Sequence, residues 1–178
     1  MAGDVMNLYP TMALKRKIDE VIARPKFQPD YPNWKGEPRT WCNEAANAIL
    51  DELGYDTRPI LEPRGRIGWT SATTMYDNAV KLAAIAGGPV HEVSPRQAQA
   101  MANLGIPILA AARRKIDDDK HHSHVGIVYP TNDQWNPKAG PLIGQAGAKA
   151  THGVRSAYDS FTKWGLTSPR YFQLPLKV

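Results

Sequence analysis

The hydrophobic pattern of this chain changes from helical to extended after residue 105, and this change constrains the fold more than any other feature. Before it, apolar residues recur at the spacing of amphipathic helices. After it, they form short runs of strand length, separated by polar or Pro- and Gly-containing segments. Helices followed by strands, rather than alternating with them, indicate the α+β class. We therefore expect N-terminal helices packed on a small antiparallel sheet.

The first part of the chain contains signals for four helices. Pro25 ends the first, Gly54 follows the second, and residues 87–89 (Gly-Gly-Pro) stop the third. Ser94 is a predicted N-cap, and Pro95 follows it at the first position of the fourth helix. The expected helices cover residues 11–23, 42–53, 71–86 and 94–103.

The second part contains four apolar runs of strand length and one more helix. Pro107, near the start of the first run, favours a strand start or an edge strand. The next run opens with His124 and ends before Pro130, and its side chains alternate between two faces. The expected strands cover residues 106–112, 124–129, 141–146 and 170–174, and the expected helix covers residues 156–164.

Length and composition favour one domain over residues 1–178, with residues 1–10 as an N-terminal arm. The single cysteine excludes an intramolecular disulfide. No run approaches the length of a transmembrane helix, so we expect no stable membrane insertion. The formal net charge of +5 favours an anionic partner. Because the basic residues are scattered in short clusters, that partner is not expected to be nucleic acid.

The only cysteine, Cys42, stands at the expected start of a helix. Thr40 is the predicted N-cap, which places Cys42 in the first turn. Unpaired backbone N–H groups and the helix dipole favour a thiolate over a thiol there. A free cysteine is also commonly a small buried hydrophobe. The position of Cys42 is therefore compatible with a nucleophile and with a core residue.

Three of the five histidines crowd into residues 121–124, shortly after the acidic residues 117–119. Such a cluster could bind a divalent metal. However, consecutive residues on a turn rarely converge on one ion, and the sequence has no second ligand pair at metal-binding spacing. We expect no metal and no other cofactor.

His124 alone fits another role, that of a base held at the mouth of a core strand. A thiol nucleophile needs such a base within hydrogen-bond reach, and a third polar group to fix the imidazole tautomer. On the next expected strand, Gln145 is a lone amide in an apolar, Gly-rich run, and its carbonyl oxygen could accept the imidazole N–H. Gln145 could equally be an ordinary polar residue of an edge strand or loop.

The order of these features resembles the papain-like cell-wall peptidases, whose small bacterial and phage members are the NlpC-like and CHAP families. In that order a Cys begins a helix, further helices follow, a strand opens with His, and the next strand carries a polar residue. The resemblance spans about residues 30–172 and rests on three segments: TWCN (40–43), SHVGIV (123–128) and IGQAG (143–147).

The resemblance implies a papain-like fold and a cysteine-dependent hydrolase that cleaves peptide or amide bonds of bacterial peptidoglycan through a thioester. It assigns Cys42 as the nucleophile, His124 as the general base and Gln145 as the residue that orients His124. Members of these families more often have His, Asn, Asp or Glu at the third position. Asn132 and Asp133, in the loop after the His124 strand, therefore remain alternatives.

The resemblance departs from papain itself at the oxyanion site. Gly36 stands where papain has its oxyanion-donating Gln, about six residues before the Cys. The oxyanion would then rely on the backbone N–H of Cys42 and on another side chain, for which Tyr31 is a candidate. Tyr31 and Trp34 are also expected to line the substrate groove.

We expect a monomer whose partner is peptidoglycan. The sequence does not predict whether the protein also has an inhibitor or immunity protein. With no visible signal peptide, the enzyme would be made in the cytoplasm. It would reach the wall by phage lysis, on a virion or through a secretion machine. Two alternatives stay open. One is a toxin-like amidase or acyltransferase with another substrate. The other is a non-catalytic wall- or protein-binding domain, in which Cys42 would be buried and inert.

Overall fold

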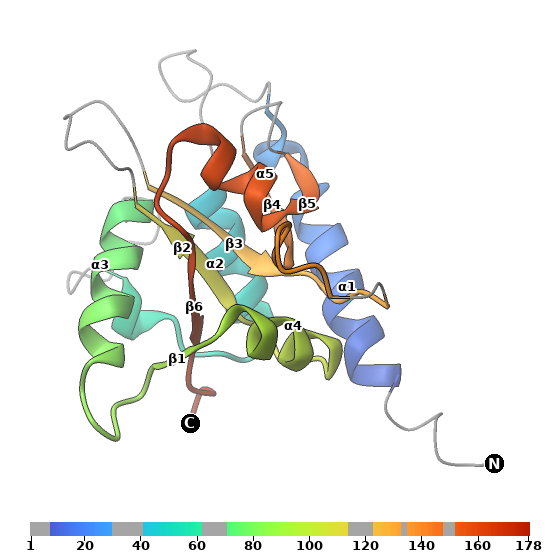
Figure 1. Ribbon diagram of the computed structural model, residues 1–178. Coiled ribbons are helices and arrows are strands. Elements are labelled where there is room, and N and C mark those ends of the chain that lie inside the picture. Colours follow the sequence, from blue (N-terminus) through green and yellow to red (C-terminus); the bar gives the residue numbers. More distant parts are fainter. Residues whose placement is uncertain (1–7, 30–40, 62–70, 114–122, 133–134, 148–151) are drawn as a thin grey trace.

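The computed structural model describes residues 8–29, 41–61, 71–113, 123–132, 135–147 and 152–178 (Figure 1). Within these residues the chain forms five α-helices, three short 3-10 helices and one six-stranded sheet. All neighbouring strands pair antiparallel. The α+β class predicted from the change of pattern is therefore confirmed.

The sheet places the last strand of the chain between the first two. Its order is β1-β6-β2-β3-β4-β5, so β2, β3, β4 and β5 follow one another as a meander. Strand β3 is flanked by β2 and β4, which puts it near the middle of the sheet. The strands are β1 (His91–Val93), β2 (Leu109–Ala112), β3 (His124–Val128), β4 (Leu142–Gln145), β5 (Gly153–Ser156) and β6 (Arg170–Gln173).

Side-chain caps fix the starts of three helices. Ser71 accepts a hydrogen bond from the backbone N–H of Thr74, and Ser156 accepts one from the backbone N–H of Asp159. Ser94 and Gln97 form a complete capping box. None of the helices within the described residues is long and apolar enough to span a membrane. The helices are α1 (Leu8–Ile22), α2 (Cys42–Glu52), α3 (Ala72–Ala83), α4 (Pro95–Asn103) and α5 (Ala157–Ser160), and the 3-10 helices are Pro25–Phe27, Arg58–Ile60 and Thr162–Trp164.

Helices α1 and α5 cover opposite faces of strand β4. Gly144 and Gln145 are neighbours on this strand, so they face opposite sides of the sheet. A Cβ built on Gly144 would collide with Ile18 of α1. On the other side, Gln145 donates a hydrogen bond to Ser160 of α5. Figure 1 shows α2 behind β2 and β3, beside α1.

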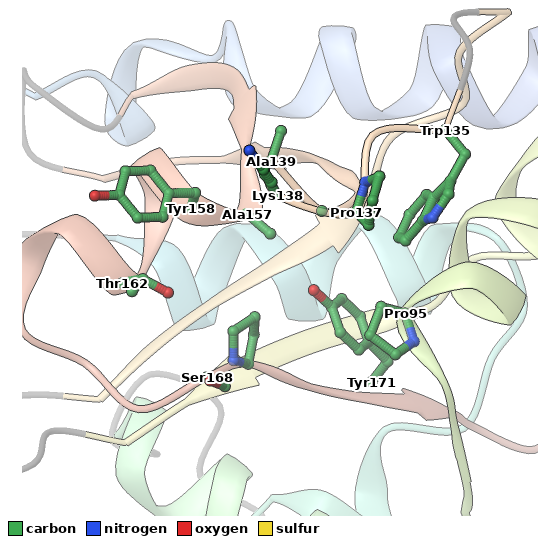
Figure 2. Close-up of a pocket in the computed structure, with 12 residues that line it drawn as sticks. Pro95, Trp135, Pro137, Lys138, Ala139, Ala157, Tyr158, Thr162, Ser168 and Tyr171 are labelled. Atoms are coloured by element: carbon green, nitrogen blue, oxygen red, sulfur yellow. The ribbon is translucent and has the colours of Figure 1, made fainter.

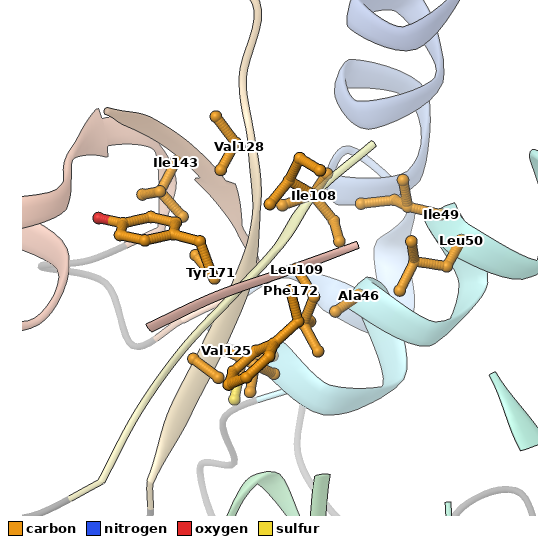
Figure 3. Packing of buried hydrophobic residues seen from close by; sticks show 14 of the residues in the cluster. Ala46, Ile49, Leu50, Ile108, Leu109, Val125, Val128, Ile143, Tyr171 and Phe172 are labelled. Atoms are coloured by element: carbon orange, nitrogen blue, oxygen red, sulfur yellow. The ribbon is translucent and has the colours of Figure 1, made fainter. Parts of the chain in front are cut away.

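Helix α2 packs its apolar stripe against the central strands. Ala46, Ile49 and Leu50 of α2 are each at most 1% exposed and lie against the sheet (Figure 3). All of β2 and residues 125–128 of β3 are also buried. Burying a Leu or Ile side chain of this kind contributes about 1.5–3 kcal/mol. The stripe therefore holds α2, and Cys42 at its start, firmly against β3.

The structure differs from the prediction at the start of α1 and at the cap of α2. Helix α1 begins at Leu8, so residues 8–10 are helical rather than part of an N-terminal arm. Helix α2 begins at Cys42 with Trp41 in the N-cap position, and Trp41 makes no side-chain capping bond. The predicted cap, Thr40, lies outside the described residues.

Two short strands, β1 and β5, were not predicted from the sequence. Both lie at an edge of the sheet, and most of their residues are polar and incompletely buried. No hydrophobic alternation marks such strands. The predicted helix over residues 156–164 is divided into α5 and a 3-10 turn at Phe161, whose side chain is fully buried.

Candidate active site

Cys42 is the first residue of helix α2. At this position the backbone N–H groups have no acceptor one turn earlier within the helix, and the positive end of the helix dipole lies beside the thiol. The side chain is 3% exposed. Because α2 packs on β3, the thiol is presented to the start of that strand.

Strand β3 brings His124 to the same place. His124 is the first residue of β3 and pairs with Ala112 of β2. The residue before it, Ser123, is 2% exposed and is bonded to Thr73 of α3. Their hydroxyl oxygens are 3.0 Å apart, and the Ser123 N–H donates to Thr73 Oγ1 at 3.4 Å. These two bonds fix the point at which the strand enters the sheet.

The imidazole of His124 lies between Cys42 and Gln145. On one side, the ring lies near enough to the Cys42 thiol for each group to shift the pKa of the other. On the other side, the ring nitrogen Nε2 is hydrogen-bonded to Gln145 Oε1. Since Gln145 occupies Nε2, Nδ1 is the nitrogen left to face sulfur. The structure thus brings together all three residues that the sequence singled out for catalysis.

Ser160 of α5 holds the other end of the Gln145 amide. Gln145 Nε2 donates to Ser160 Oγ at 2.8 Å, and the carbonyl oxygen of Gln145 is turned to His124. The ring of Phe161, the next residue, packs against the His124 ring with centroids 5.6 Å apart and planes tilted by 57°. Neither Ser160 nor Phe161 was singled out in the sequence. A single Ser in a short amphipathic segment carries no local signal of such a role.

The charges of the pair reinforce each other. Burial raises the pKa of the Cys42 thiol. The charge of His124, its hydrogen bonding, and the backbone groups of Val125 and Asn43 lower that pKa, and together they outweigh burial. The net effect is a lowered pKa for Cys42. Burial lowers the pKa of His124, and the bonds to Cys42 and Gln145 more than reverse that effect, so its pKa is raised. These directions favour a thiolate–imidazolium ion pair.

Gly126 of β3 makes room for Gln145. A Cβ built on Gly126 would lie 2.5 Å from Ile143 Cγ2 and 3.2 Å from Gln145 Cβ. Any larger residue would push both side chains away from β3. Steric crowding therefore explains the glycine in the SHVGIV segment, because only glycine lets Gln145 approach the His124 strand this closely.

Of the other residues proposed for this site from the sequence, only Asn132 lies within the described residues. Tyr31, Trp34 and Asp133 lie outside the described residues. Asn132 is exposed and follows the far end of β3, whereas His124 begins that strand. The structure therefore favours Gln145 over Asn132 as the partner of His124.

Within the described residues, no group of three His, Cys, Asp or Glu side chains is placed to hold a metal ion. The acidic residues 117–119 and the histidines 121 and 122 lie outside the described residues.

Two hollows of the surface lie apart from the Cys42–His124 pair. One, of about 490 Å³, lies between α5, β6 and the segment before β4 (Figure 2). The other, of about 520 Å³, lies between β1 and the C-terminal residues. Neither is lined by Cys42, His124 or Gln145.

Two sequence comparisons give no relative from which a function could be transferred. A scan against protein-family models finds no match, and a search of curated protein sequences finds no significant one. Function must therefore be argued from the site itself.

Proposed function

We propose that the chain is a papain-like cysteine hydrolase that cleaves peptide or amide bonds of bacterial peptidoglycan. The observation that carries this proposal is the pairing of Cys42, at the start of α2, with His124, at the start of β3. Gln145 is bonded to the Nε2 of the same imidazole. A cysteine that only fills the core has no need of an imidazole partner. A non-catalytic domain would also have a buried Cys42, but the pKa shifts of this pair favour a reactive thiolate over an inert thiol.

In the first step, the Cys42 thiolate attacks the carbonyl carbon of the scissile amide. A C–S bond forms, and the carbonyl electron pair moves onto oxygen. When the tetrahedral intermediate collapses, the C–N bond breaks and the His124 imidazolium donates its Nδ1 proton to the leaving amine. The products of this step are an amine and a thioester on Cys42.

In the second step, water hydrolyses the thioester. His124, now neutral, takes a proton from the water as oxygen attacks the thioester carbon, and the C–S bond breaks to regenerate the thiolate. Throughout, Gln145 Oε1 accepts the Nε2–H of His124 and keeps Nδ1 directed at sulfur. Gln145 thus acts by positioning the base.

The start of α2 also supplies electrostatic stabilisation. The oxyanion of each tetrahedral intermediate forms next to Cys42, where the helix presents its N-terminal N–H groups. The backbone N–H of Cys42 itself is the donor that this mechanism requires.

The choice of peptidoglycan is supported by the resemblance to cell-wall peptidases and by charge. The formal net charge of +5 attracts an anionic polymer. Because this attraction acts between exposed charges over a distance, added salt should weaken it.

The test is incubation with purified peptidoglycan, followed by mass analysis of released fragments. We expect the wild type to release muropeptides with and without a metal chelator. Cys42→Ser and His124→Ala should each lower the rate by at least about a thousandfold, and circular dichroism should show that both variants remain folded. Release that survives either substitution would contradict the mechanism.

The same assay separates the alternatives. An ionised Cys42 with no release from any wall preparation would favour a toxin-like amidase or acyltransferase with another substrate. An un-ionised thiol together with tight wall binding would favour a non-catalytic domain.

A further inference from the structure

A groove of about 490 Å³ lies on the far side of helix α5 from the catalytic pair. The α5 residues Ala157 and Tyr158 line it, as does Thr162 just after the helix. Ser160 and Phe161, from the same turn, contact Gln145 and His124. The groove and the candidate active site are thus separated by one turn of helix.

The buried side chain of Tyr171 points its hydroxyl into this groove. Tyr171 is 2% exposed, and its hydroxyl has no hydrogen-bond partner among the described residues. Figure 2 shows the oxygen directed toward the segment that carries Pro137 and Ala139. The hydroxyl oxygen is not one of the fully buried, unpaired polar atoms of the described residues, so it opens onto the groove. A hydroxyl that faces a groove and has no protein partner can bond water or a ligand there. The side chain is therefore placed to bond a ligand.

Gly140 keeps the space above this hydroxyl open. Its φ of 70° lies in the left-handed region, where glycine is favoured. A Cβ built on it would lie 3.0 Å from Ala157 Cβ and 3.9 Å from the Tyr171 hydroxyl. A side chain at position 140 would begin to cover the hydroxyl.

The rest of the lining combines aromatic rings with polar ends. Trp135 and Tyr158 stand at the two ends of the groove, and Tyr158 is 51% exposed (Figure 2). Thr162 and Ser168 add hydroxyl groups, and Lys138 adds a positive charge. Among the described residues, none that lines the groove is acidic.

We propose that this groove binds a glycan strand of the bacterial cell wall. Pyranose rings present apolar C–H faces that pack on aromatic rings such as those of Trp135 and Tyr158, and hydroxyls that can bond Tyr171. Carboxylate-bearing sugars would complement Lys138 and the net positive charge. This inference rests on the proposed function, because it extends the substrate from the cleaved amide to the polymer that carries it.

A glycan in the groove would keep the stem peptides near the catalytic pair. Since α5 separates the groove from Gln145 and His124, a strand held on one side leaves its peptides within a short distance of the other. Such tethering raises the local concentration of scissile bonds.

The test measures binding of peptide-free glycan strands by calorimetry, in a Cys42→Ala background that cannot cleave. Tyr171→Phe removes only the hydroxyl, and it should raise Kd by about three- to tenfold. Tyr158→Ala, which removes one aromatic end, should have an effect of about the same size. Lys138→Ala should weaken binding and reduce its dependence on salt. The matched control is Tyr55→Phe, in the other hollow, which should leave Kd unchanged.

Each outcome decides the inference independently of cleavage. Failure of the strands to bind would overturn it even if the enzyme releases muropeptides. Binding that ignores all three groove substitutions, or binding of a proline-rich peptide in place of the glycan, would also overturn it. Glycan binding that is lost in the groove variants would support it even if the wild type cleaves no wall, which would instead refute the proposed function.

Discussion

Ser160 accepts a 2.8 Å hydrogen bond from the side-chain amide of Gln145, and each of the two residues is only 1% exposed. A glutamine amide can be turned either way, with oxygen or nitrogen toward a given neighbour. A serine hydroxyl can bond either end of an amide, but the Nε2–H of the His124 imidazolium needs an acceptor, so the amide oxygen faces His124 and the nitrogen faces Ser160. Ser160 then holds the Gln145 amide in this orientation from helix α5.

The first prediction concerns the ionisation of Cys42. Its pKa is lowered mainly because His124 outweighs the effect of burial, and the pKa of His124 is raised in return. Thiolate should therefore persist below the ordinary thiol pKa of about 8.5. In His124→Ala the attraction is lost while burial remains, so the midpoint should move above that value. Ultraviolet absorbance of the thiolate, taken as the difference from Cys42→Ser, measures this without a reagent that must reach a buried sulfur. A wild-type midpoint at or above the ordinary value would contradict the ion pair.

The second prediction concerns Ser160. Ser160→Ala leaves the Gln145 amide nitrogen without its partner, which lets the amide turn away from His124. We expect turnover to fall by about three- to tenfold, less than in Gln145→Ala, and the pH–rate profile of His124 to shift in both variants.

Ser94→Ala is the matched control for this loss of a serine hydroxyl. It removes the N-cap of α4 and should cost about 1 kcal/mol of stability, but it should leave the pH profile of the folded enzyme unchanged. If Ser160→Ala also lowers only the melting temperature, the role of Ser160 is structural.

The sequence predicted the parts of this site that carry a local signal. Cys42 begins an amphipathic helix, and His124 opens an apolar strand, so hydrophobic periodicity and the signals for helix and strand ends locate both. Gln145 was recognisable as a polar residue in an apolar strand. The class of fold followed from the same patterns.

The parts that could not be predicted depend on long-range packing. Ser160 lies 15 residues from Gln145 in sequence, and Thr73 lies 50 residues from Ser123. Nothing near either residue indicates its partner. The edge strands β1 and β5 were not predicted for a related reason. A partly exposed strand needs no hydrophobic alternation, because its neighbour in the sheet stabilises it.

The third prediction compares two glycines on opposite faces of the sheet. Gly126→Ala places a Cβ against Ile143 and Gln145, whereas Gly144→Ala places one against Ile18 of α1. Both should destabilise the fold by about 1–3 kcal/mol, as overpacking of a core does. Only Gly126→Ala should also lower turnover and shift the pH profile of His124, because only this Cβ displaces Gln145. Denaturant unfolding and activity, measured on the same samples below the melting transition, separate the two effects. Equal losses of activity in the two variants would show that Gly126 acts only through stability.

The fourth prediction concerns the ion pairs that join α2 to Lys17 of α1 and to Arg24, just after α1. Glu52 at the end of α2 bonds Arg24 at 2.7 and 2.8 Å and Lys17 at 3.1 Å. Chiefly through the Arg24 bonds, its pKa falls from 4.5 to about 2. A carboxylate whose folded pKa is depressed adds stability above its unfolded pKa, and that contribution is lost as pH falls through the folded value. Glu52 is about one-third exposed, so its contribution to stability should be at most about 1 kcal/mol.

Urea unfolding of Glu52→Gln should show a stability deficit of this size at pH 7, and the deficit should shrink as pH falls from 4.5 toward 2. Glu20→Gln, which removes a more exposed carboxylate with longer contacts to the same two cations, should show a smaller deficit. A deficit in Glu52→Gln that stays constant down to pH 2 would mean that the side chain contributes by packing and not by charge.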